Sequence, residues 1–199
     1  MKLNNNFMKK GFTLLELLIV IGILAILAAT TVLVLNPAEL LKQARDSQRV
    51  SDMATLNSAL GLYLTSVSSP VLGLAVGADC PTDCYTITNT GTPAANCGGR
   101  YTAPRINTYD ADRTVDATGW LPVAFTGISG GSPLSVLPAD PTVNSATLFY
   151  SYACDQTNLT YELGTTFEST KYMTDLDLDG KDGGNNASYE IGTDPGLDL

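Results

Sequence analysis

The stretch KKGFTLLELLIVIGILAILAATTVLVL, from Lys9 to Leu35, decides the architecture of this chain. Residues 12–35 contain a single charge, Glu16, and a helix of that length is about 36 Å long, which exceeds the roughly 30 Å hydrocarbon core of a bilayer. Lysines precede the run and no basic cluster follows it closely, which indicates a cytoplasmic N-terminus and an exported remainder. A carboxylate inside such a segment is costly and normally has a partner, so Glu16 requires an explanation.

Three interpretations compete for this segment. A cleaved secretory signal needs small residues after its apolar core, and residues 28–30 could serve, but the apolar run continues to Leu35. A plain signal anchor leaves Glu16 as an accident near the membrane interface. The third interpretation places a cut between Gly11 and Phe12, before the apolar run rather than after it.

The residues around Gly11 favour the third interpretation. A short basic leader, then Gly11, Phe12, Glu16 and an uninterrupted apolar run resemble the class III signal of type IV pilins and type II secretion pseudopilins. The resemblance implies that a prepilin peptidase cleaves after Gly11 on the cytoplasmic face and then methylates the new amine of Phe12. Residues 1–11 are then a leader peptide, and residues 12–35 form a helix that is first transmembrane and later the filament core.

Cleavage after Gly11 would give Glu16 a partner that the precursor lacks. The new amine of Phe12 lies one helical turn from Glu16, so a neighbouring subunit shifted along a filament axis could pair its amine with this carboxylate. The resemblance implies that Phe12 and Glu16 serve assembly in this way. The alternative is that Glu16 is protonated or extends to the membrane surface.

Residues 36–65 are expected to continue the helix into a head. Asn36 is a capping residue, Pro37 suits the first helical position, and Glu39 completes a capping-box pattern. Pro37 also removes one helical hydrogen bond, so a kink is expected there. The local helix melting that the resemblance implies for filaments could centre on Gly22 or on Pro37.

The second half of this helix has amphipathic periodicity. Apolar residues recur at spacings of three and four, at Met53, Leu56, Leu60 and Tyr63. Charged residues alternate in sign along what we expect to be the outer face, where they would be solvated or would contact neighbouring subunits. They are Glu39, Lys42, Arg45, Asp46, Arg49 and Asp52.

Residues 66–199 are predicted to form an extracytoplasmic globular head. Its clearest strands are residues 147–154 and 159–168, TLFYSYAC and LTYELGTTFE, which are separated by a hairpin-like turn. Residues 119–125, GWLPVAF, have strand character that Pro122 interrupts. The predicted fold class is α+β, with a pilin-like long N-terminal helix packed on a small antiparallel β-sheet.

The composition excludes several classes of function. The 199-residue chain carries a formal net charge of −9, which argues against nucleic acid as a general partner. It contains no histidine, which removes His-based catalysis and His metal sites. An even number of cysteines in an exported chain favours two disulfides over free thiols or a Cys-only zinc site, and three pairings are possible among Cys80, Cys84, Cys97 and Cys154.

An acidic segment near the C-terminus, TDLDLDGKDGG, is the second chemical feature. Its carboxylates alternate and a glycine follows them, as at the opening of a calcium loop. The position that holds Glu in an EF-hand is Asn186 here, so a calcium loop of another kind is the expectation, and a solvated acidic turn is the alternative. The resemblance supports calcium, because major pseudopilins bind it in a C-terminal loop. The possible ligands are Asp175, Asp177, Asp179 and Asp182.

These features predict a structural subunit of a type IV pilus or a type II secretion pseudopilus, and not an enzyme. Its partners would be further copies in a helical homopolymer, the prepilin peptidase and the inner-membrane assembly platform of the pilus or secretion system. The precursor would cross the inner membrane once, and the assembled subunit would lie in an extracellular or periplasmic filament. The alternative is a signal-anchored exported protein that binds or adheres in a calcium-dependent way.

Overall fold

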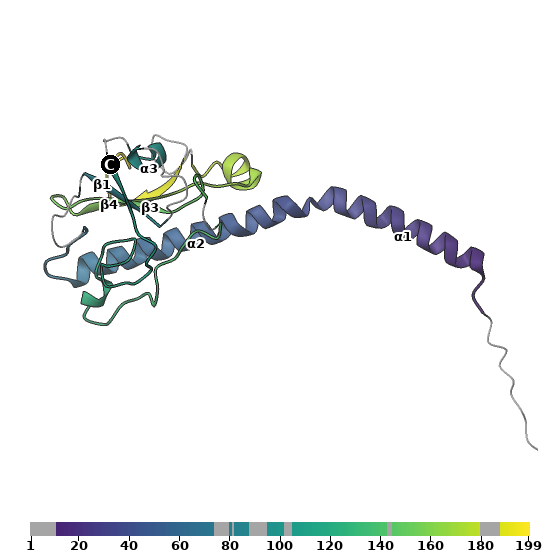
Figure 1. The fold of residues 1–199 in the computed structure, drawn as a ribbon, viewed down its shortest axis with the longest axis horizontal. Coiled ribbons are helices and arrows are strands. Elements are labelled where there is room, and N and C mark those ends of the chain that lie inside the picture. The colour runs from purple at the N-terminus through teal and green to yellow at the C-terminus, as the bar shows by residue number, and fades with distance from the viewer. Residues whose placement is uncertain are drawn as a thin grey trace, which may run out of the picture. The chain divides into compact units, whose positions relative to one another are not determined.

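A computed structural model describes residues 11–73, 80, 82–87, 95–101, 105–142, 145–179 and 188–199. The chain divides into two compact units, Met1–Leu40 and Leu41–Leu199. The first contains a long apolar helix, and the second is a head built on a five-stranded sheet (Figure 1).

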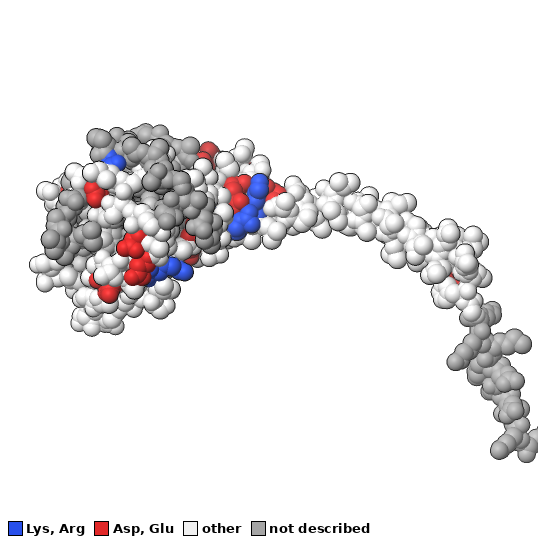
Figure 2. Space-filling model, in the orientation of Figure 1, with Lys and Arg blue, Asp and Glu red and all other residues white. Residues whose placement is uncertain are grey.

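The helix α1 (Leu14–Leu35) is apolar on every side and none of its residues is buried. Its length and composition suffice to cross a membrane, as the sequence predicts. Figure 2 shows this segment almost entirely in the colour of uncharged residues. Such a helix cannot stay in water by itself, because its apolar side chains need lipid or protein around them.

Asn36 interrupts the helical backbone between α1 and α2 (Pro37–Ser66). Its φ of 40° and ψ of 71° are left-handed, a conformation that asparagine tolerates better than most residues. The amides of Glu39 and Leu40 donate to the carbonyl oxygen of Asn36 at 3.0 and 3.3 Å, so Asn36 begins the hydrogen bonds of α2 while it ends α1. Pro37 occupies the first helical position, where its missing N–H costs nothing.

The sheet of the head has the strand order β2-β1-β3-β4-β5. The strands are β1 (Asp83–Thr86), β2 (Ile106–Tyr109), β3 (Ser151–Asp155), β4 (Thr160–Thr165) and β5 (Tyr189–Gly192). Four of them pair antiparallel, and β2 runs parallel to β1 at one edge. The α+β prediction is therefore confirmed, with a mixed sheet in place of a wholly antiparallel one.

The main core lies between α2 and one face of the sheet (Figure 1). Alternation along the strands turns Tyr152 and Cys154 of β3 and Tyr161 and Leu163 of β4 toward this core. The apolar stripe of α2 packs against them, as its periodicity predicts. The stripe consists of Met53, Leu56, Ala59, Leu60 and Tyr63.

A second, smaller cluster covers the other face of the sheet. It contains Cys84, Cys97, Tyr101, Phe149 and Ala153, with the C-terminal Leu199 packed against it. The short helix α3 (Ala95–Gly99) belongs to this layer. The sheet is thus covered on both sides, which the sequence did not predict.

Residues 119–125 are not a strand, so that expectation was wrong. They form bends, with an isolated bridge between Asp116 and Ala124, and lead into a 3₁₀ turn, η1 (Phe125–Gly127). Their side chains are nevertheless core residues, since Trp120, Leu121 and Val123 are buried and the indole N–H of Trp120 donates to a backbone carbonyl. The apolar character that suggested a strand reflects burial of an irregular segment.

The four cysteines form two disulfides, Cys80–Cys154 and Cys84–Cys97. The first joins residues 74 positions apart and ties the segment before β1 to the end of β3. The second joins β1 to α3 across 13 positions. The sequence left three pairings open, and the positions of the strands select this one.

Candidate processing and assembly site

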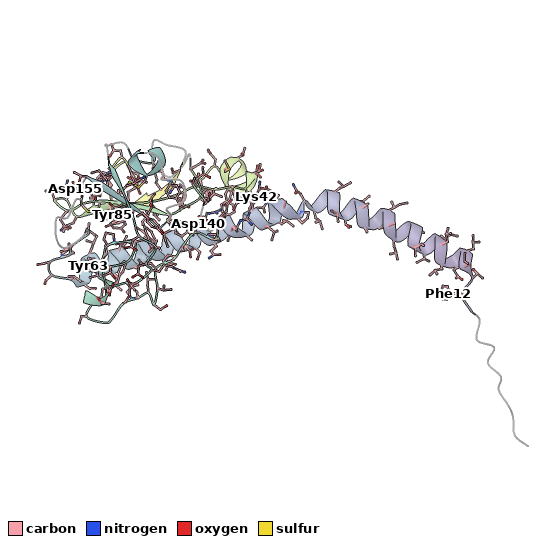
Figure 3. The ribbon with its side chains drawn as sticks, viewed as in Figure 1. Phe12, Lys42, Tyr63, Tyr85, Asp140 and Asp155 are labelled. Atoms are coloured by element: carbon pink, nitrogen blue, oxygen red, sulfur yellow. A yellow bond between two sulfur atoms is a disulfide. The ribbon has the colours of Figure 1, made fainter. Side chains whose placement is uncertain are left out.

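The Gly11–Phe12 bond lies in a short non-helical segment before α1 (Figure 3). Phe12 is 79% exposed, and a Cβ built on Gly11 would meet no atom within 4 Å. A peptidase needs an accessible peptide that is not locked into a helix. The predicted cleavage point meets both conditions, because Gly11 and Phe12 are exposed and lie outside the helix.

Thr13 begins α1 as its N-cap. Its φ and ψ are extended, and its hydroxyl oxygen accepts a hydrogen bond from the amide of Glu16 at 3.2 Å. Thr13 and Glu16 have the spacing of a capping box, in which the Thr side chain satisfies an amide of the first turn. This role of Thr13 was not predicted, although the sequence T-L-L-E from Thr13 to Glu16 has the capping-box spacing.

Glu16 therefore has a second role besides the proposed pairing. It is exposed and is the acidic residue of the first turn, where a carboxylate stabilises the positive end of the helix dipole. The structure places Phe12 immediately before the cap and Glu16 in that turn, as the predicted assembly site requires. Pairing between copies is a property of the filament and stays a prediction.

The helix runs through Gly22 without interruption, and its break lies next to Pro37, at Asn36. A Cβ added at Gly22 would meet no atom within 4 Å, so Gly22 needs no special backbone conformation here. Its use in a melted filament helix stays a prediction.

The charged residues of α2 do not line its outer face, so that expectation was wrong. Asp46 and Arg49 are completely buried, and the other four are half-buried. The reason is tertiary, because the head supplies partners for the middle of α2. Glu168 and Asp140 bind its arginines. Ser169 donates to Asp46, and Tyr150 donates to Asp52. In Figure 3 one of these partners, Asp140, lies beside α2.

Arg49 is the centre of this buried network. Its guanidinium donates to both carboxylate oxygens of Asp140 at 2.7 and 2.8 Å, to Asp46 at 2.6 Å and to Glu168 at 2.9 Å. Arg45 adds a two-pronged contact to Glu168 at 2.6 and 2.7 Å. These bonds join α2 to two loops that are more than 90 residues away in the sequence.

The network perturbs the pKa values of its members. Hydrogen bonds from Arg45 and then Arg49 lower the pKa of Glu168 to about 2. Burial lowers the pKa of Arg49, but hydrogen bonds and charges from Asp140, Glu168 and Asp46 outweigh burial and hold this pKa above its ordinary value. Glu168 and Arg49 are therefore charged at neutral pH, and the network is a structural cross-link between α2 and two loops of the head.

A further buried acid lies in the middle of β4. Glu162 is fully buried, and Glu190 on the neighbouring strand is 2% exposed. Burial, and next the charge of Glu190, raise the pKa of Glu162 to about 8. Glu162 lies on the face of β4 opposite to Tyr161 and Leu163, and the layer containing Tyr101 and Leu199 covers that face. The amide of Leu199 donates to Glu162 Oε2 at 3.2 Å.

The acidic segment is described only in part. Asp175 ends a turn of π-helix, η2 (Lys171–Asp175), and Asp177 has a left-handed backbone with a φ of 51°. Asp179 precedes a gap, and Asp182 lies outside the described residues. Among the described residues, no three acidic or cysteine side chains gather where they could hold a metal. Calcium binding thus stays a prediction.

Comparison with known proteins gives the N-terminal segment an independent assignment. Residues 6–32 match the family model of the prokaryotic N-terminal methylation motif. No significant match was found among curated proteins or among solved structures. The matched segment contains the predicted cleavage point, the Thr13 cap, Glu16 and most of α1.

Proposed function

Because residues 6–32 carry the class III signal of type IV pilins and pseudopilins, we propose that this protein is a filament subunit polymerised through α1. In this proposal a prepilin peptidase hydrolyses the peptide bond after Gly11, and a methyl group is then transferred to the amine of Phe12. The motif indicates a structural subunit rather than an enzyme. The single observation that carries the proposal is an accessible Gly11–Phe12 bond directly before a helix with no buried residue.

The physical case for polymerisation rests on α1. Its apolar side chains are solvated by lipid in the precursor and need an equivalent environment after extraction. A bundle of α1 helices from many copies supplies that environment. Inside it an unpaired Glu16 would be costly, and the Phe12 amine of a neighbour offsets that cost and fixes the axial shift between copies.

Cleavage also changes the charge of the subunit. Loss of Lys2, Lys9 and Lys10 takes the formal net charge from −9 to −12. Copies with that charge repel one another at low ionic strength, so filaments should form more readily with added salt or divalent cations. The assembly platform in the inner membrane, of a pilus or of a secretion system, would extract the subunits.

The proposal is tested by the mature N-terminus and by Glu16. Mass spectrometry of the purified protein should find a methylated Phe12, whereas an intact Met1 or a start near Thr31 would support a plain anchor or a secretory signal. Glu16→Gln should insert into the membrane normally but form no filaments, because it removes the charge and keeps the size. The readout is the amount of sheared or sedimented filament.

Thr13→Ala is the matched control for Glu16. It removes the observed cap hydrogen bond and leaves the carboxylate in place. If Glu16 acts only by starting the helix, both variants should lose assembly to the same extent. If Glu16 acts by pairing with the Phe12 amine of a neighbouring copy, the Thr13→Ala variant should retain most of its filament assembly. Normal filaments from Glu16→Gln would contradict the pairing.

We propose calcium as a ligand of the acidic segment, on the chemistry of its alternating carboxylates. Titration of the full chain in detergent with Ca²⁺ should release or absorb heat and raise the melting temperature. Asp177→Asn should weaken both effects, while the matched variant Asp155→Asn, at the end of β3, should leave them unchanged. Absence of any heat or thermal shift in the unsubstituted protein would exclude the site.

A further inference from the structure

The sheet of the head has two edge strands, and they differ in exposure. In β5 no residue is fully exposed, since Glu190 is buried and the other three residues are half-buried. In β2 the first and last residues carry large side chains that are open to solvent: Ile106 is 68% exposed and Tyr109 is 42% exposed. Such side chains on an edge strand give another segment a surface on which to pack.

The backbone of β2 also presents hydrogen-bonding groups on its outer side. The amides of Ile106 and Asp110 donate to carbonyl oxygens of residues 82–86 at 2.9 and 3.2 Å, so these amides face β1. Alternation along the strand then directs the N–H and C=O groups of Asn107 and Tyr109 away from β1. Within the described parts of the head, no strand pairs with this outer side. An extended peptide could therefore continue the sheet at β2.

The sequence of β2 contains none of the usual features that block an edge strand. Native edge strands are commonly protected by a lysine, a proline or a bulge. The sequence INTY of β2 has no charge and no proline, and its four pairs with β1 follow one another without a bulge. The strand is therefore able to pair on its outer side.

The loop of residues 110–118, which follows β2, is acidic and has a fixed conformation. Asp110, Asp112 and Asp116 are exposed, and each accepts a hydrogen bond from the amide two residues further on, at 2.8, 3.0 and 3.2 Å. Arg113 is the basic residue of this loop, and its Nε donates to the carbonyl oxygen of Leu137 at 2.6 Å. Three carboxylates against one guanidinium leave the end of β2 negatively charged.

This charge discriminates between possible occupants of the edge. A second copy of the chain is disfavoured, because residues 41–199 hold 18 acidic and 8 basic side chains and two such heads repel each other. A segment that carries lysine or arginine beside alternating apolar residues is favoured. Its cations would meet the carboxylates of the loop, and its apolar side chains would cover Ile106 and Tyr109.

We propose that β2 and the acidic loop of residues 110–118 form a docking site for an extended, basic polypeptide segment of another protein. The segment would add a strand to the sheet through the outer backbone groups of Asn107 and Tyr109. Its basic side chains would pair with Asp110 and Asp112. The proposal goes beyond the filament function and does not depend on it, because the strand and the loop both belong to the head.

The first test measures the binding of synthetic peptides to the full chain in detergent, by fluorescence anisotropy and without calcium. The probe is the labelled peptide Lys-Thr-Val-Thr-Val-Lys, which should bind, and more weakly as the salt concentration rises. A peptide with both lysines replaced by glutamate should bind about tenfold more weakly or less. A peptide with an inner valine replaced by proline should also bind weakly, because proline cannot donate to a strand. No binding of the lysine peptide, or equal binding of the glutamate peptide, would overturn the proposal.

The second test changes the strand. Tyr109→Pro removes one outward N–H and the exposed ring, while the bonds from Ile106 and Asp110 to the β1 segment stay in place. This variant should lose the binding of the lysine peptide and keep the melting temperature of the unsubstituted protein. Normal binding by a folded Tyr109→Pro variant would show that the peptide binds elsewhere and would overturn the proposal.

The third test changes only the charge of the loop. In Asp112→Asn the side-chain oxygen can still accept the amide of Thr114, so the loop should keep its conformation. The lysine peptide should bind this variant more weakly, and with a smaller dependence on salt. Asp175→Asn, at the end of η2, removes the same charge from another part of the head and should bind like the unsubstituted protein. Equal binding by both variants would contradict the part assigned to the loop.

Sedimentation in detergent tests for the other occupant. If the unsubstituted protein forms dimers that Tyr109→Pro abolishes, β2 pairs with a second copy and the proposal is overturned. A failure of the filament function gives a different result, because a protein without methylated Phe12 or filaments should still bind the lysine peptide. Filaments that form normally from a protein without peptide binding would leave only the docking site wrong.

Discussion

Folded proteins usually bury apolar side chains and expose charged ones. The two compact units of this protein depart from that rule in opposite ways. Helix α1 exposes every one of its large apolar side chains, whereas the head buries ionisable ones, including Asp46, Arg49 and Glu162. In the head, most of the buried ionisable side chains form hydrogen bonds or ion pairs with other residues of the head. Among the described residues of its own unit, helix α1 has no such partner, and its apolar side chains need lipid or protein around them.

The largest effect should come from removing the centre of the head's network. Arg49→Ala leaves three carboxylates near one another without their common cation and should lower the free energy of unfolding by about 3 to 5 kcal/mol. Leu24→Ala in α1, an exposed position, is the matched control and should leave unfolding of the head unchanged. Thermal unfolding of the full chain in detergent measures both.

If Arg49→Ala and Leu24→Ala had equal small effects, the buried network would contribute little, and the inward charges of α2 would need another explanation. Arg45→Ala removes a partly exposed member of the same network and should destabilise the head less than Arg49→Ala does.

A smaller effect should appear in the pH dependence of the head. The folded head holds a proton on Glu162, because burial and then Glu190 raise its pKa from 4.5 to about 8. The stabilisation that comes from protonated Glu162 is complete below pH 4.5 and is lost as the pH rises toward 8. Glu162→Gln mimics the protonated form, so its melting temperature should fall less than that of the unsubstituted protein between pH 5 and pH 8. If the melting temperatures of the two proteins fell equally between pH 5 and pH 8, the raised pKa of Glu162 would be contradicted.

Glu168 should behave in the opposite way. Its pKa is lowered from 4.5 to about 2, so its contribution is present above pH 4.5 and is lost as the pH falls toward 2. Glu168→Gln should therefore destabilise the head at neutral pH. The melting temperature of this variant should fall less steeply than that of the unsubstituted protein as the pH drops below 4.5. Its fall between pH 5 and pH 8, which depends on Glu162, should be unchanged.

The N-terminal half was predictable because its signals are local. Uninterrupted apolar residues predict α1, the spacing of Gly11, Phe12 and Glu16 predicts the processing motif, and Pro37 marks the start of α2. The apolar stripe of α2 and the hairpin of β3 and β4 were also readable, since periodicities of 3.6 and 2 require only neighbours in the sequence.

The sequence alone predicted an apolar helix long enough to cross a membrane, a methylation motif at its start and a head of class α+β, because those features depend on composition and short spacings. The folded structure was needed to find where the charges of α2 point, which cysteines pair and that Glu162 is buried. The physical reason is that each of these depends on groups far away in the chain: Asp140 for Arg49, Cys154 for Cys80, and Leu199 for Glu162.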